Sequence, residues 1–122
     1  MRCYVRLVSW VNEFVADYLA AFNASVASGD VAPLLGRYTD DAVLRFENVP
    51  PDSSTLEFAG RKAYTAAYTD NPPDDQIDLL GEPVDKGGHV LAGFAWRRDQ
   101  STGVLDLTVT DGLISRITVI FG

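Results

Sequence analysis

The strongest constraint on the fold is a hairpin near the end of the chain. Two strand-like segments, Val104–Thr110 and Leu113–Phe121, are separated by Asp111-Gly112. This dipeptide is typical of a two-residue type I′ turn, which needs a positive φ at both positions. The sequence therefore predicts an antiparallel sheet in the C-terminal half.

The N-terminal half is predicted to be mainly helical. Between Trp10 and Ser28, apolar side chains recur at the i, i+3, i+4, i+7 spacing of an amphipathic helix. Ser9 is the expected N-cap, and Gly29 suits the position after the last turn. Two shorter helices are expected at Val31–Tyr38 and Arg61–Thr69.

The remaining segments are predicted to be strands, which gives an α+β fold. Helices gathered at one end of an antiparallel sheet make this class, and a curved sheet with a long helix across its concave side encloses a conical space. The further strands are expected at Ala42–Glu47, Thr55–Phe58, Gln76–Leu80 with a continuation past Pro83, and His89–Arg98.

Length and charge limit the classes of function. The 122 residues, of 13.3 kDa, predict a single domain over 1–122. Lys and Arg number 10 and Asp and Glu number 17, so the formal net charge is −7. Such a chain repels phosphate backbones and anionic lipid, and we expect no nucleic-acid or membrane partner. The N-terminal residues make a poor signal peptide, so a cytoplasmic location is expected.

The scarcity of cysteine and histidine excludes several kinds of site. A single cysteine, Cys3, rules out an intramolecular disulfide and the multi-cysteine zinc patterns. A single histidine, His89, rules out HExxH. Because His89 follows Gly87-Gly88, we interpret it as an exposed turn residue. No metal and no cofactor are implied.

Four short motifs mark element boundaries in an order typical of one superfamily. They are Phe22-Asn23-Ala24 to Ser28-Gly29-Asp30, Tyr38-Thr39-Asp40-Asp41-Ala42-Val43, Phe58-Ala59-Gly60-Arg61-Lys62-Ala63 and Thr110-Asp111-Gly112-Leu113-Ile114-Ser115-Arg116-Ile117. With them the chain, from about residue 11 to 122, resembles the NTF2-like superfamily and its SnoaL-like and ketosteroid-isomerase-like branch. The resemblance implies a cone in which a curved antiparallel sheet and three helices in the N-terminal half enclose a pocket. A shared fold does not assign an activity, since members include isomerases, cyclases, dehydratases and binding proteins.

The resemblance also implies candidate catalytic positions. In the isomerase branch, a carboxylate base ends the first strand, and a helix-1 tyrosine with a protonated aspartic acid forms an oxyanion hole. The base position falls on Phe46, with Glu47 beside it. The tyrosine position falls on Phe22, one turn after Tyr18, and the aspartic acid position falls on Asp106. Asp106, Tyr18 and Glu47 are therefore the catalytic candidates.

Strand alternation leaves the role of Asp106 open. It puts Asp106, Thr108 and Thr110 on one face and Leu105, Leu107 and Val109 on the other. If the polar face is wet, Asp106 is a surface residue. If that face lines the pocket, as the resemblance implies, burial would raise the pKa of Asp106 and make it a donor or general acid.

Glu47 also has two interpretations. It shares a strand face with Arg45, and a surface ion pair would account for both residues. Alternatively, the strand bends near Val49-Pro50 and brings Glu47 to the mouth of the pocket as a base.

Aromatic residues from several elements point to a ligand cavity. Ordinary core filling would account for them, but rings that surround a hollow would form flat apolar walls suited to a cyclic or polyketide-like molecule. The residues expected to line such a pocket are Phe22, Phe46, Tyr64, Tyr68, Phe94, Trp96 and Phe121.

Two functions follow from these features. The first is a small-molecule enzyme of the isomerase, cyclase or hydratase type, which acts on an apolar ligand with Asp106 as acid, base or oxyanion partner. The second is a non-catalytic ligand-binding or dimerisation module, in which Phe22 and Phe46 replace catalytic side chains. We also expect a homodimer, in which a second copy covers Leu105, Leu107 and Val109 on the outer face of the sheet.

Overall fold

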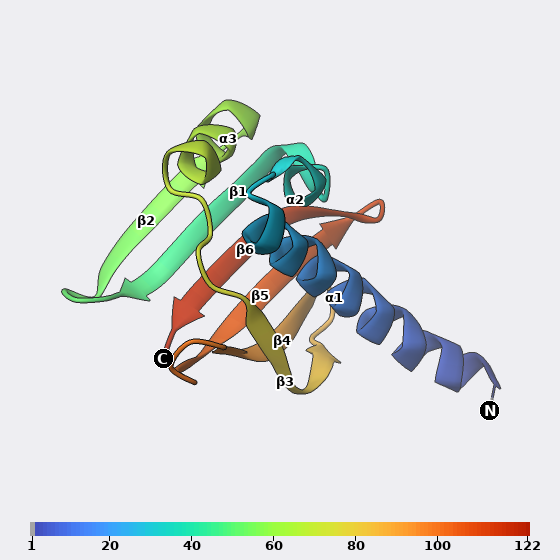
Figure 1. Ribbon diagram of the computed structural model, residues 1–122. Helices are drawn as coiled ribbons and strands as arrows, with labels where there is room; N and C mark the ends of the chain where they lie inside the picture. Colours follow the sequence, from blue (N-terminus) through green and yellow to red (C-terminus); the bar gives the residue numbers. More distant parts are fainter. Residues whose placement is uncertain (1) are drawn as a thin grey trace.

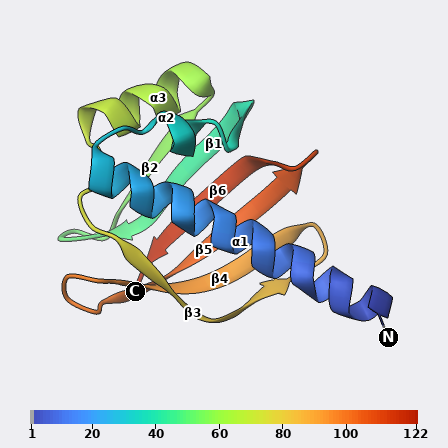
Figure 2. The same ribbon diagram turned by 45° about the vertical axis from the view of Figure 1, so that its right-hand side comes forward.

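A long helix lies across one face of a six-stranded sheet (Figures 1 and 2). The computed structural model describes the backbone of residues 2–122 and the side chains of residues 10–122. The N-terminal end of the long helix projects beyond the sheet edge, and a third helix covers the first two strands at the opposite side. The elements are α1 (Arg2–Ser28), α2 (Ala32–Leu35), β1 (Tyr38–Val49), β2 (Ser54–Ala59), α3 (Arg61–Asp70), β3 (Ile77–Asp85), β4 (His89–Trp96), β5 (Thr102–Thr110) and β6 (Leu113–Phe121).

The strand order is β2-β1-β6-β5-β4-β3. Four neighbouring pairs are antiparallel, but β1 and β6 run parallel. The prediction of an antiparallel sheet is therefore wrong at this one pair. A parallel pair needs a long crossover connection, and here the chain from β2 through β5 forms that connection.

Irregularities in the strands bend the sheet around α1. Register shifts occur in β1 between Phe46 and Val49 and in β3 between Leu80 and Val84. Bulges of this kind bend a strand and increase its twist. The tight hairpin between β5 and β6 has a φ of 52° at Asp111 and 79° at Gly112, which confirms the predicted type I′ geometry.

The helices differ from the prediction mainly at their ends. Because α1 begins at Arg2, the expected start at Ser9 is wrong, and the side chain of Ser9 lies outside the described residues. The second helix ends at Leu35, three residues early, since Tyr38 already belongs to β1. Its N-cap residue is Val31, and Asp30, one residue earlier, accepts a hydrogen bond from the Ala32 amide at 3.0 Å.

The interior between α1 and the sheet has a packed part and a hollow part. In the packed part, side chains from helices and strands are fully buried against one another, as in an ordinary core. This part fixes α1 on the sheet. Its most buried members include Val15, Leu34, Leu107, Ile114 and Ile117, each with no exposed surface.

Candidate ligand-binding cavity

A cavity of about 400 Å³ opens between α1, α3 and the inner face of the sheet. This volume lies in the range of small-molecule sites. The rings therefore surround a hollow, which agrees with the second of the two interpretations that the sequence left open. Buried residues form its inner part, namely Tyr18, Phe22, Leu44, Tyr68, Ile77, Phe94, Leu105 and Val119. Partly or fully exposed residues form its opening, namely Phe46, Val49, Leu56, Phe58, Ala67, Asn71, Pro72, Pro73, Asp74, Trp96 and Phe121.

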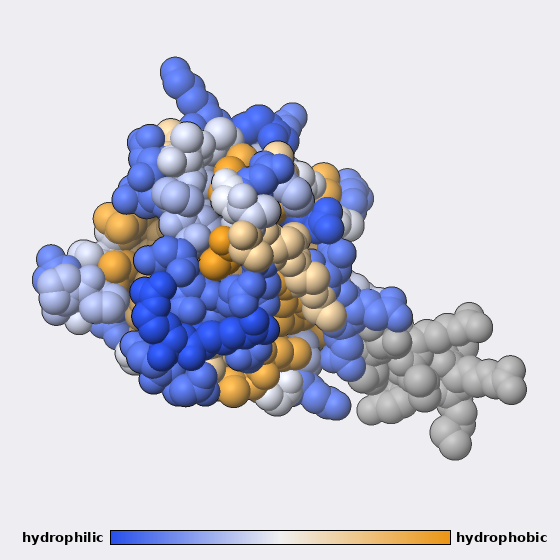
Figure 3. Space-filling view, viewed as in Figure 1, coloured by the Kyte–Doolittle hydropathy of each residue, from blue (hydrophilic) through white to orange (hydrophobic). Residues whose placement is uncertain are grey.

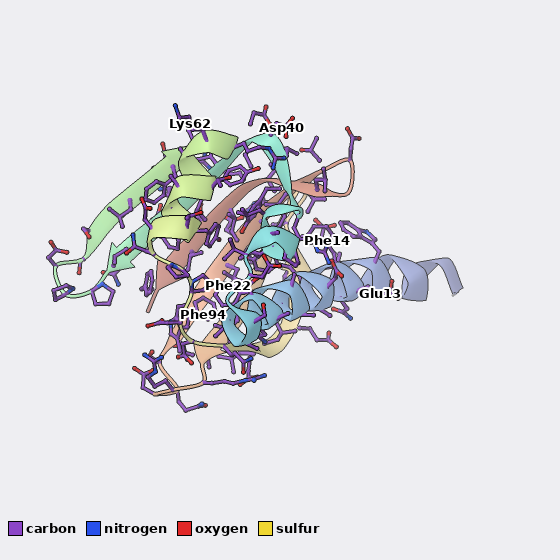
Figure 4. The ribbon with its side chains drawn as sticks, turned by 45° about the horizontal axis from the view of Figure 1, so that its top comes forward. Glu13, Phe14, Phe22, Asp40, Lys62 and Phe94 are labelled. Carbon is purple, nitrogen blue, oxygen red and sulfur yellow. The ribbon has the colours of Figure 1, made fainter. Side chains whose placement is uncertain are left out.

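Aromatic rings in contact build one continuous wall of the cavity. Phe94 meets Trp96 edge to face at 5.2 Å, and Trp96 stacks on Phe121 at 6.0 Å. Phe22 of α1 also lies 6.4 Å from Trp96, and Figure 4 shows Phe22 and Phe94 together at the C-terminal end of α1. Each ring has only two torsion angles, so contacts of this kind hold a rigid, flat surface for a ligand.

A glycine on β5 makes room for this wall. A Cβ atom at Gly103 would lie 2.6 Å from the ring of Phe94 and 2.6 Å from the main-chain oxygen of Ile120. Any other residue would push the ring or the strand away. Gly103 therefore decides where the Phe94 ring sits in the cavity, although it does not itself line it.

Three tyrosine hydroxyls meet at the inner side of the cavity. The Tyr38 hydroxyl lies 3.2 Å from that of Tyr18 and 2.9 Å from that of Tyr68. The residues come from α1, β1 and α3, and the side chains are almost completely buried. Tyr18 and Tyr68 line the cavity and Tyr38 lies behind them. We refer to Tyr18, Tyr38 and Tyr68 as the tyrosine triad.

Burial keeps the tyrosine triad protonated. Desolvation raises the pKa of Tyr68 to about 12 and raises the pKa of both Tyr18 and Tyr38 well above 10. Charge repulsion between neighbouring phenolates adds to the shift of Tyr18 and Tyr38. At neutral pH all three hydroxyls are therefore uncharged and can donate hydrogen bonds.

The loop between α3 and β3 forms part of the opening. Its surface is hydrophilic in the space-filling view, next to exposed hydrophobic surface over β2 (Figure 3). The Arg98 side chain donates to the main-chain oxygen of Asp74 at 2.8 Å, and the Asp75 carboxylate accepts from the Arg98 amide at 3.2 Å. Asn23 of α1 bonds both main-chain groups of Ile77 at 2.9 Å. The loop is thus tied to α1 and to the β4–β5 turn.

The structure brings most of the predicted pocket residues together, with one exception. Tyr64 is fully buried but lies outside the cavity, and its hydroxyl donates to the main-chain oxygen of Thr39 at 3.1 Å. The expectation for Tyr64 is therefore wrong, because the residue points toward the start of β1. The predicted residues that do line the cavity are Tyr18, Phe22, Phe46, Tyr68, Phe94, Trp96 and Phe121.

Asp106 lies on the other side of the sheet. Its neighbours Leu105 and Leu107 are buried on the inner face, so alternation turns Asp106 outward. Its side chain is 32% exposed, and its Oδ1 lies 2.7 Å from the Nδ1 of His89, within hydrogen-bond distance. The expectation that Asp106 faces the cavity is therefore wrong. His89 is partly buried in this pair and begins β4, so its interpretation as an exposed turn residue is wrong.

Glu47 lies on the outer face as well. Its carboxylate accepts a hydrogen bond from the Arg45 Nε at 2.7 Å, and Arg45 also contacts Glu57 of β2 at 3.1 Å. The strand does bend after Phe46, but the bend does not turn Glu47 into the cavity. The ion-pair interpretation describes this residue correctly.

Sequence reasoning missed the polar member of the site that lies deepest. Tyr38 was placed at the end of a helix, whereas it opens β1 and links the hydroxyls of Tyr18 and Tyr68. The Tyr38-Thr39-Asp40-Asp41 motif carried the only available signal, because it marks a strand start. No sequence pattern indicated that Leu56 and Asn71, at the opening, would line the cavity.

Metal-binding clusters and membrane-spanning helices are both absent from the described residues. Among them, no three His, Cys, Asp or Glu side chains are grouped so that they could hold a metal ion. No helix in the same part of the chain is long and apolar enough to cross a membrane.

Comparison with known proteins identifies the fold. No protein-family model matches the sequence, and no curated protein matches it. Among solved structures, a candidate isomerase of the SnoaL-like family from Agrobacterium tumefaciens is similar with a TM-score of 0.67 and 16% identity, over 93% of this chain and 98% of that one.

Two further structures agree with this result. A candidate ketosteroid isomerase from Kribbella flavida is similar with a TM-score of 0.60 and 22% identity, over 92% of this chain and 77% of that one. An NTF-2 like protein of unknown function from Burkholderia xenovorans has a TM-score of 0.62 and 17% identity, over 92% and 85%. At this level of identity the similarity concerns the fold alone. The chain therefore has the α+β fold of the NTF2-like proteins, with a mixed, curved six-stranded sheet.

Proposed function

We propose that the protein binds a small, largely apolar, ring-bearing molecule in the cavity, and that the tyrosine triad donates a hydrogen bond to an oxygen atom of that molecule. The observation that carries this proposal is the meeting of three buried hydroxyls at the inner side of a largely apolar cavity. In small-molecule sites, a few polar groups in an apolar pocket fix the orientation of the ligand.

The protonation of the tyrosine triad supports a ligand that accepts. Burial keeps the hydrogen on each of its hydroxyls at neutral pH, so each hydroxyl can donate one hydrogen bond. The Tyr38 hydroxyl lies 3.2 Å from that of Tyr18 and 2.9 Å from that of Tyr68, and the hydroxyls of Tyr18 and Tyr68 also interact with each other. Because Tyr18 and Tyr68 line the cavity, a ligand carbonyl or ether oxygen would accept a hydrogen bond from one of them.

The walls support a ring-bearing body. Flat aromatic side chains and aliphatic ones make up nearly all of the cavity lining. A planar or fused-ring molecule buries the most apolar area against such walls, at about 25 cal/mol per Å².

Paired ligands that differ by one oxygen atom test this proposal. The affinities of 1-tetralone, a bicyclic ketone, and of tetralin, its hydrocarbon, are measured for the native protein and for the double variant Tyr18→Phe/Tyr68→Phe. A hydrogen bond to the ketone contributes about 0.5–1.5 kcal/mol, so the preference for tetralone should fall by about 2- to 12-fold in the double variant. The two ligands differ in hydration, but this difference is the same for both proteins. It therefore cancels when the preference of the native protein is compared with that of the double variant.

Tyr64→Phe is the matched control. It also removes a buried tyrosine hydroxyl, but one outside the cavity, so it should leave the preference for tetralone unchanged. The proposal is wrong if neither ligand binds to the native protein, or if the folded double variant keeps the full preference for the ketone.

A second candidate function is catalysis of the isomerase, cyclase or hydratase type. The names of two structural relatives, both candidate isomerases, favour it. A neutral tyrosine hydroxyl in a dry site stabilises negative charge that develops on a substrate oxygen. Such a reaction also needs a base, and Glu47 and Asp106 are on the outer face. Among the described residues that line the cavity, the carboxylate is that of Asp74.

Hydrogen exchange separates the two functions. An enzyme of this type would exchange the hydrogens beside the carbonyl of bound 1-tetralone with solvent deuterium, at a rate that depends on Tyr18 and Tyr68. A binding protein would hold the same ketone without accelerating its exchange.

A further inference from the structure

We infer that the cavity selects its ligand by charge: the ligand is not anionic, and it carries a protonated amine at the end that faces the opening. This inference rests on the proposed function and specifies the class of its ligand. It follows from the distribution of charge around the cavity, from its inner side to its rim.

The inner side of the cavity cannot hold an anion. The described residues that line it include no Lys, Arg or His. An ionised carboxylate or phosphate that entered would lose its hydration and find no cation in return. The ionisable groups there, Tyr18 and Tyr68, are neutral donors that suit an uncharged oxygen.

Among the described residues that line the cavity, the charged side chain is at the rim, and its charge is negative. Asp74 is the lining residue with a carboxylate, and its side chain is 85% exposed. The cation that the structure places near it is Arg98, whose Nη1 is 3.8 Å from Asp74 Oδ2, beyond hydrogen-bond distance. The carboxylate therefore retains hydrogen-bonding capacity toward a donor at the opening.

The position of Asp74 is fixed from both sides. The Arg98 side chain holds its main-chain oxygen at 2.8 Å, and two prolines, Pro72 and Pro73, stiffen the preceding backbone. Beyond it, Gln76 donates to the main-chain oxygen of Asn23 at 3.2 Å. A ligand group at the opening would therefore meet a backbone that already holds Asp74 at the rim.

The whole chain adds a long-range effect of the same sign. With 17 acidic against 10 basic residues, the net charge of −7 attracts cations and repels anions on approach. A ligand with an acceptor oxygen at one end and a protonated amine at the other therefore matches the inner hydroxyls, the apolar walls and the rim.

Three ligands with the same rings test this inference. They are 1-tetralone, its 6-aminomethyl derivative and its 6-carboxylate, in which the added charge lies across the ring system from the ketone. We expect the amine to bind about two- to fivefold more tightly than the parent, as for an exposed ion pair. We expect the carboxylate to bind at least about tenfold more weakly than the parent.

Two variants locate the effect. Asp74→Asn should remove most of the advantage of the amine, and added salt should do the same in the native protein. Asp111→Asn is the control, because it changes the net charge by the same amount. Asp111 lies in the β5–β6 turn, outside the cavity lining, and asparagine tolerates the positive φ of this position. This variant should leave the advantage of the amine nearly intact.

The outcomes distinguish this inference from the proposed function. If 1-tetralone binds but the amine and the carboxylate bind equally well, the charge selection is wrong and the proposed function stands. If Asp74→Asn and Asp111→Asn have equal effects, the rim subsite is wrong. If 1-tetralone itself does not bind, the proposed function is wrong and this inference falls with it.

Discussion

The two faces of the sheet have opposite characters, and β5 shows the contrast within a few residues. On its inner face Leu105 lines the cavity and Leu107 lies in the packed core, with almost no exposed surface. On its outer face Asp106 pairs with His89 at 2.7 Å and remains partly exposed. On β5 the inner face therefore carries core and cavity residues, while the outer face carries a polar pair at Asp106.

The outer face continues this pattern across the neighbouring strands. Strand pairing aligns Asp106 of β5 with Thr118 of β6, Thr118 with Arg45 of β1, and Arg45 with Glu57 of β2. Charged groups on an exposed sheet face form pairs of small individual value. A carboxylate in this row has solvent and a partner beside it, so it resembles a surface residue more than a catalytic acid.

The largest expected difference between the two faces is in the free energy of unfolding, when adjacent residues of β5 are substituted one at a time. Leu107→Ala removes a side chain without exposed surface and should lower the free energy of unfolding by about 2–5 kcal/mol. Asp106→Ala, one residue away, should lower it by less than about 1 kcal/mol. Urea unfolding measures both, and equal losses for the two variants would contradict the assignment of the faces.

Alkaline pH tests the burial of the tyrosine triad on the inner side. The folded pKa of Tyr68 is about 12, against about 10 in the unfolded chain. Between these values the unfolded chain ionises while the folded protein keeps its proton, so stability that is present below about pH 10 is lost as the pH rises.

Tyr68→Phe isolates this contribution. Between about pH 10 and pH 12, its free energy of unfolding should fall less steeply than that of the native protein, by about 1.4 kcal/mol per pH unit. Ionisable groups away from the tyrosine triad titrate equally in both proteins. Parallel stability curves over this range would show that the Tyr68 hydroxyl is not buried.

The smallest effect concerns self-association through the outer face. The predicted patch of Leu105, Leu107 and Val109 is wrong, because Leu105 and Leu107 are buried on the inner face. Strand pairing instead aligns a row without charged residues across four strands, in which Leu80 and Val104 are exposed, and a second copy could cover this surface. The row consists of Leu80, Gly93, Val104 and Ile120.

Dimerisation therefore remains a prediction, now through a different row. Acidic and basic groups lie beside it, Asp106 and Arg45 among them, so two copies related by a two-fold axis can oppose unlike charges. Val104→Lys should weaken the dimer by at least about tenfold, and Leu113→Lys, at the β5–β6 turn, should not. Sedimentation that finds only monomer at high concentration would contradict this prediction.

Local patterns determined the elements of this protein. The apolar spacing between Trp10 and Ser28 predicted most of α1, and Asp111-Gly112 predicted the β5–β6 hairpin. Alternation also separated Leu105 and Leu107 from Asp106 correctly. Period and turn chemistry are properties of neighbouring residues, so they can be recognised without knowledge of the rest of the chain.

Only the tertiary structure decided which side of the sheet is the inside. Alternation assigns residues to two faces but does not say which face α1 covers. In the structure α1 covers the face opposite to Asp106 and Glu47, so neither residue lines the cavity. The tyrosine triad likewise joins residues that are 20 and 30 positions apart along the chain. Such contacts depend on how helices and strands pack, because no local pattern fixes the distance between hydroxyls on three different elements.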